Sequence, residues 1–81
     1  MITEAQYKGD YKILVCFDDG TMHLADFRDF ISQSALPCVR KYLDLDLFRQ
    51  FSVNEWGLCW GENEFDINPL SIHNGDFDVS E

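Results

Sequence analysis

The feature that most constrains the fold is an apolar run that ends in a tight turn. Residues 11–17 read Tyr-Lys-Ile-Leu-Val-Cys-Phe, and Asp18-Asp19-Gly20 follow at once. An apolar run of this length, bounded by turn residues, is typical of a β-strand buried on both faces. Asp-Gly is a strong hairpin signal, because glycine takes the positive φ that a tight turn needs. Residues 21–27 are therefore predicted to return as an antiparallel neighbour.

The register of this hairpin decides which side chains share a face. If Asp19-Gly20 is a two-residue loop, Cys16 lies opposite His23. A three-residue turn with a bulge would instead move every pairing by one residue and separate Cys16 from His23. We prefer the two-residue loop because it gathers five apolar side chains on one face: Ile13, Val15, Phe17, Met22 and Leu24.

The rest of the chain predicts one α+β domain. Residues 2–8 form a first strand that turns at Gly9-Asp10, and helical segments follow, with Pro37 opening one of them and Asp44 or Asp46 capping another. Residues 51–54, 58–60 and 65–67 read as short strands, with Trp60 in the core and a helical turn from Pro69. We expect an antiparallel β-sheet that begins as a β-meander and carries one helical layer, in the order β-β-β-α-β-β, with a domain over residues 1–75 and an acidic, frayed tail over 76–81.

Charge and cysteine content limit the classes of function. Fifteen acidic against six basic side chains give a formal net charge of −9. Nucleic acids and anionic membranes would repel such a surface, whereas a basic protein partner would match it. Three cysteines without paired spacing, and no basic, apolar leader after Met1, indicate a cytoplasmic protein with reduced thiols.

Cys16 and His23 form the one pair that suggests chemistry. Opposite each other, they could activate a thiolate or contribute two ligands to a metal. A structural zinc needs four ligands, however, and acidic surroundings raise the pKa of a thiol. A small enzyme or metal protein that uses Cys16 and His23 with nearby carboxylates is therefore kept only as the alternative to a binding module.

Two groups of carboxylates have ordinary structural explanations. Asp residues at a hairpin bind backbone N–H groups, and Asp26 can cap the next helix or pair with Arg28. The acidic segment 62–66 lacks the pattern of a calcium loop and is typical of a solvated loop. We therefore predict no catalytic, cofactor-binding or metal-binding residue and no enzyme, having weighed these candidates: Asp18, Asp19, Asp26, Glu62, Glu64 and Asp66.

The candidate interface is the second face of the central strand. The helical block can cover one face, and an uncovered apolar face is rare on a monomer. We expect a second copy of the chain to cover it, which predicts a homodimer, unless residues 65–72 fold back over the same face. An exposed Trp56 in the turn at 55–57 would add an anchor. The predicted interface residues are Leu14, Cys16, Ala25, Phe27 and Trp56.

Several of these segments together resemble the family called domain of unknown function 2442. The resemblance covers most of the chain, but Gly61 stands where the family often has proline and His73 where it often has tyrosine. It implies a short prokaryotic protein, of the kind proposed to form one half of a toxin–antitoxin-like pair, and so a binding or regulatory module. The segments that carry it are 11–21, Asp26, Leu47-Phe48, Trp60 and Asp66-Ile67-Asn68-Pro69.

Overall fold

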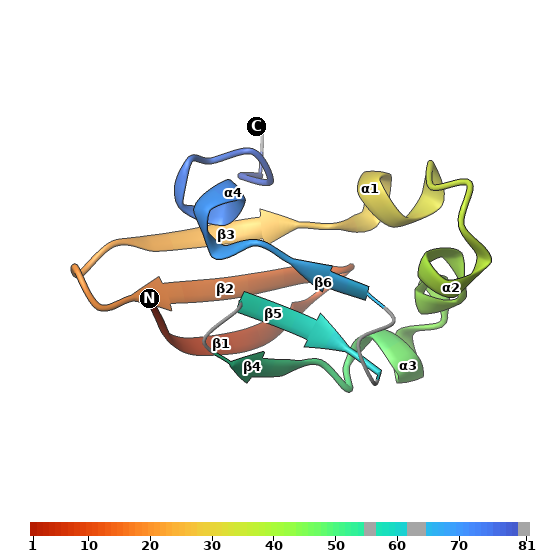
Figure 1. The fold of residues 1–81 in the computed structure, drawn as a ribbon, viewed down its shortest axis with the longest axis horizontal. Helices are drawn as coiled ribbons and strands as arrows, with labels where there is room; N and C mark the ends of the chain where they lie inside the picture. The colour runs from red at the N-terminus through yellow and green to blue at the C-terminus, as the bar shows by residue number, and fades with distance from the viewer. Residues whose placement is uncertain (55–56, 62–64, 80–81) are drawn as a thin grey trace.

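The computed structural model describes residues 1–54, 57–61 and 65–79, which contain six strands in two antiparallel sheets. Each sheet has three strands in chain order, and the second sheet lies in front of the first in Figure 1. The predicted α+β class and element order are confirmed, with the strands divided between two sheets. The elements are β1 (Ile2–Gly9), β2 (Lys12–Phe17), β3 (Met22–Asp26), α1 (Arg28–Ser32), α2 (Pro37–Arg40), η1 (Lys41–Leu43), α3 (Leu45–Phe48), β4 (Ser52–Asn54), β5 (Gly57–Trp60), β6 (Phe65–Ile67) and α4 (Pro69–His73).

The turn between β2 and β3 has three residues, so the preferred two-residue register is wrong. The Phe17 N–H donates to the Thr21 carbonyl at 2.9 Å, and the Gly20 N–H donates to the Phe17 carbonyl at 3.1 Å. Gly20 has φ +89°, as expected for the bulge position of a three-residue hairpin loop. Because of the extra loop residue, Ala25 and Phe27 lie on the buried face, where the two-residue register would have placed Met22 and Leu24.

The first turn is also displaced by one residue from its expected position. Gly9 pairs with Lys12, so Asp10 and Tyr11 form the loop rather than Gly9 and Asp10. Both loop residues have positive φ, which is the backbone of a type I′ turn. Tyr11 offsets this strained backbone with contacts, because its hydroxyl donates to the Leu43 carbonyl and its ring lies 5.4 Å from that of Phe48.

The helices begin where the sequence signals them. Pro37 opens α2, and the Asp44 side chain accepts the Asp46 N–H at the start of α3. Helices α1 to α3 lie together at one end of the two sheets, whereas α4 lies against β3 (Figure 1). No helix in the described part of the chain has the length and apolar character needed to span a membrane. The side chains that these helices bury are Ile31, Val39, Tyr42, Phe48 and Ile72.

Trp60 is the centre of the core, as expected. It is fully buried on β5, and its indole N–H donates to the Phe48 carbonyl at 2.8 Å. Its ring stacks on Phe65 at 4.6 Å and on Phe48 at 5.5 Å, and it meets Phe27 edge-on at 5.9 Å. These contacts join both sheets and the helices in one hydrophobic cluster.

Residues 77–79, which lie within the segment expected to be an acidic, frayed tail, extend the first sheet. The Asp26 N–H donates to the Phe77 carbonyl at 2.8 Å, and the Val79 N–H donates to the Leu24 carbonyl at 3.0 Å. The Phe77 ring packs 4.9 Å from Phe27. The open edge of β3 is thereby paired over these residues, and the last two residues of the chain lie outside the described part.

Candidate functional site

The outer face of the β2–β3 hairpin carries two cross-strand pairs of apolar side chains in contact with solvent. Leu14 lies opposite Leu24, and Cys16 lies opposite Met22. Met22 is 65% exposed and Leu24 is 37% exposed, while Leu14 and Cys16 are half-buried. The opposite face of the same strands is filled by the core, so all four side chains depend on solvent or a partner for cover.

Two of the predicted interface residues belong to the core instead. Ala25 and Phe27 are fully buried, because the three-residue turn places Ala25 opposite Ile13 on the inner face. The structure leaves Leu14 and Cys16 partly exposed on the outer face but buries Ala25 and Phe27, whose places on that face Met22 and Leu24 take. Trp56 lies outside the described residues.

Two adjoining hollows continue this apolar face across the edge of the sheet. The first, of about 290 Å³, lies beside Met22 and Leu24. The second, of about 340 Å³, contains the half-exposed ring of Phe30 and four carboxylates. Asp78 and Val79 line both, so the hollows form one surface that is apolar at one end and acidic at the other. The residues of the second hollow are Asp26, Asp29, Phe30, Asp76, Phe77, Asp78 and Val79.

Cys16 and His23 are not in contact, which removes the geometric basis of the predicted thiolate or metal pair. Cys16 projects to the outer face opposite Met22, whereas His23 lies opposite Val15 on the inner side. The other two cysteines are also free, Cys38 exposed and Cys59 buried. Within residues 1–54, 57–61 and 65–79, no group of three or more histidine, cysteine or acidic side chains could hold a metal ion.

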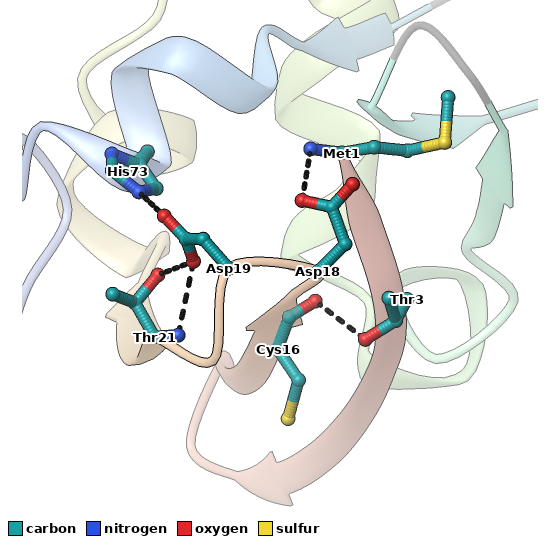
Figure 2. Close-up of polar contacts among 7 residues, drawn as sticks. All are labelled: Met1, Thr3, Cys16, Asp18, Asp19, Thr21 and His73. Carbon is teal, nitrogen blue, oxygen red and sulfur yellow. Dashed lines mark hydrogen bonds and ion pairs between the residues drawn. The ribbon is translucent and has the colours of Figure 1, made fainter.

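His23 and His73 each contact a carboxylate far away in the sequence. The His23 Nδ1 lies 2.9 Å from Asp78 Oδ1, and the His73 Nε2 lies 2.8 Å from Asp19 Oδ2. Figure 2 shows the second contact, between α4 and the β2–β3 turn. Both imidazole rings meet Phe17 edge-on, at 5.8 and 4.9 Å. These contacts connect the C-terminal segment to the β2–β3 hairpin. The local sequence carries no signal for them.

The hairpin carboxylates perform the structural tasks that the sequence predicts. Asp19 Oδ1 accepts the Thr21 hydroxyl at 2.6 Å and the Thr21 N–H at 3.0 Å (Figure 2). The Thr21 hydroxyl, then its N–H, then His73 hold the pKa of Asp19 well below the ordinary value of an aspartate. Asp26 Oδ1 accepts the Arg28 N–H at 3.0 Å just before α1, whose N-cap residue is Phe27 and has no side-chain cap.

The acidic segment near β6 is only partly described. Asp66 is exposed on β6 opposite Cys59, on the second sheet. Glu62 and Glu64 lie outside the described residues. Asp66 therefore lies apart from the hairpin carboxylates, which belong to the first sheet.

Comparison with known proteins returns a single result. No curated protein and no solved structure matches the chain. A family model with the description "Protein of unknown function (DUF2442)" matches residues 2–78, nearly the whole chain, and confirms the resemblance found in the sequence. The chain belongs to this family of proteins of unknown function.

Proposed function

We propose that this chain is a non-catalytic, cytoplasmic protein-interaction module that binds its partner through the outer face of the β2–β3 hairpin. The observation that carries this proposal is the pair of apolar cross-strand contacts on that face, Leu14 with Leu24 and Cys16 with Met22. Met22 keeps 65% of its surface in solvent on a strand rather than on a loop. A rigid, exposed apolar sheet face is typical of a protein-binding surface.

The geometry around the face also supports binding rather than chemistry. The hairpin carboxylates bind backbone N–H groups, the N-terminal ammonium or a histidine, and Cys16 has no histidine beside it. The three free thiols fit a reducing compartment. A regulatory role as one half of a two-protein pair, which the family resemblance implies, would use the same face. A second copy of the chain is the simplest partner that a test can detect.

The test is a photo-crosslinking amino acid placed at position 22 in cells of the native host. Met22 is exposed, so the replacement leaves the core intact. The matched control places the same group at Gln33, which is exposed beyond the end of α1. We expect a protein adduct at position 22 and none at position 33. The mass of the adduct distinguishes a second copy from another protein, and equal or absent crosslinking at both positions contradicts the proposal.

A further inference from the structure

The surface along β3 and residues 77–79 indicates the kind of partner that the module binds. Resting on the proposed function, we infer that the partner is a different, basic protein that lays a segment with aliphatic side chains at one end and cationic side chains at the other along this surface. The aliphatic side chains contact Met22 and Leu24, and the cationic ones enter the acidic hollow.

The apolar end of the surface fits an aliphatic side chain. Met22, Leu24 and Val79 line a hollow of about 290 Å³ together with His23 and Asp78. Met22 and Leu24 project from the same face of β3, two residues apart, so they present a continuous strip along the strand. Burial of such a strip by a partner's side chains would remove apolar surface from water.

The acidic end fits cations. Four carboxylates line the second hollow, and the ion pair of Asp78 with His23 is the only one that any of them makes within the described residues. Arg28 gives Asp26 only a backbone N–H, and Lys12 lies opposite Asp26 in the β2–β3 register without an ion pair between them. Asp29 and Asp76 have no cationic partner in the described part of the chain. Arginine or lysine from another protein would therefore meet carboxylates that this chain leaves available.

One exposed aromatic side chain adds to this match. The ring of Phe30 is 45% exposed in the same hollow as the carboxylates. It is held in place by stacking on Phe65 at 5.7 Å and by an edge contact with Phe77 at 5.6 Å. A guanidinium group packs favourably over such a ring while it pairs with a neighbouring carboxylate.

The net charge argues against a second copy as the occupant of this surface. Each chain carries a formal charge of −9, so two copies repel each other, and this surface would bring acidic hollows close together. A basic partner gains from the same field, in both encounter rate and specificity.

The test measures binding of a short fluorescent peptide, with valines in one half and arginines in the other, by anisotropy at about 0.15 M salt, where distant charges are screened. One variant carries Asp26→Asn, Asp29→Asn and Asp76→Asn. Its matched control carries Asp10→Asn, Asp46→Asn and Asp66→Asn, three exposed sites away from the hollow with the same change in net charge. We expect the first variant to bind about tenfold more weakly than wild type and the control to change less than about twofold.

Two further arms complete the test. Met22→Ser with Leu24→Ser should weaken binding by several-fold, and the same peptide with glutamate in place of every arginine should not bind. Equal weakening in both triple variants overturns the inference, because overall charge alone would then explain binding. No binding of the arginine peptide also overturns it. A second copy as the adduct at position 22 also overturns it, while the proposed interaction function stands.

Discussion

Strands β2 and β5 are each the middle strand of a three-stranded sheet, but their burial differs. In β2, half-buried and buried positions alternate, so that Leu14 and Cys16 remain partly in solvent. In β5, all four residues are buried, although the strand includes a glycine. Strand β2, which has the longer apolar run in the sequence, is thus the strand with an open face.

The difference comes from what covers the second face of each strand. On β5, Gly57 lies so close to Ile67 and Pro69 that a side chain would not fit, and Cys59 Sγ has Ser52 Oγ and Asn54 Nδ2 each at 3.2 Å. On β2, no comparable neighbours enclose the outer pairs in the described part of the chain, and Met22 stays largely exposed. Burial of a central strand therefore depends on its three-dimensional neighbours more than on its own hydrophobicity.

The largest expected effect is at Trp60, on the fully buried strand. Trp60→Ala removes the stacked contacts with Phe48 and Phe65 and leaves the Phe48 carbonyl without its donor. We expect a loss of about 3 to 5 kcal/mol in the free energy of unfolding, measured from urea transitions. Trp60→Phe keeps much of the packing and should lose less free energy of unfolding. It can therefore be measured even if the alanine variant does not fold. Met22→Ala, on the open face, should change the free energy of unfolding by less than about 0.5 kcal/mol, and a loss comparable to that of Trp60→Ala would show that the outer face is covered.

The next effect compares two glycines with positive φ. At Gly57, with φ +114°, a Cβ atom would lie 2.2 Å from the Ile67 carbonyl oxygen, whereas at Gly20, with φ +89°, it would meet open space. Gly57→Ala should therefore cost about 3 kcal/mol through backbone strain and overlap. Gly20→Ala should cost about 1 kcal/mol through backbone strain alone, and Gly20→Val somewhat more. Thermal and urea unfolding of the variants measure both, and equal losses would contradict the close packing of β5 against β6 and α4.

A smaller effect separates the two faces of β2 itself. Val15→Thr places a hydroxyl at a fully buried position and should lower the free energy of unfolding by about 1 to 2 kcal/mol. Cys16→Ser, at the next residue but on the half-buried outer face, should change it by less than about 0.5 kcal/mol. The ratio of the two losses in urea transitions reports which face is open. A reversed order would mean that Cys16, and not Val15, faces the core.

The smallest effect concerns the pH dependence of the hairpin turn. Because the pKa of Asp19 is lowered in the folded chain, its ionised form stabilises the fold above the unfolded pKa of about 3.9, and this contribution is lost as the pH falls toward the folded value. Asp19→Asn should therefore lower the urea midpoint at pH near 6, and the difference from wild type should shrink in strong acid. Thr21→Val removes the largest cause of the shift and should reproduce part of this behaviour. A difference in urea midpoint that grows as the pH falls would contradict a lowered pKa of Asp19 in the folded chain.

Much of the local structure follows from short stretches of sequence. Gly20 indicates the hairpin, Pro37 the start of α2, and Asp44 the start of α3, because each acts on residues only a few positions away. The buried position of Trp60 also follows, since a large aromatic side chain within a strand seldom remains in water. The one-residue difference in turn length was beyond such signals, because two- and three-residue loops both suit Asp-Gly.

The candidate surface shows the limit of local reasoning. Leu14 and Cys16 were expected on it, but Met22 and Leu24 entered only with the observed register. The acidic hollow beside them depends on Asp78 and its neighbours folding back onto β3, with a bridge to Ala25. The His23–Asp78 and His73–Asp19 contacts span 55 and 54 residues of sequence, so no local pattern announces them.

By itself, then, the sequence determined the acidic charge, the α+β class, the approximate positions of the turns and the starts of α2 and α3, because these follow from composition and from interactions within a few residues. Only the tertiary structure decided which face of β3 stays open and where the C-terminal segment pairs. The physical reason is that side chains alternate along a strand, so a single extra loop residue reverses the faces. Which face is then covered depends on partners elsewhere in the chain, and here the second sheet and residues 77–79 left Leu14, Cys16, Met22 and Leu24 facing solvent.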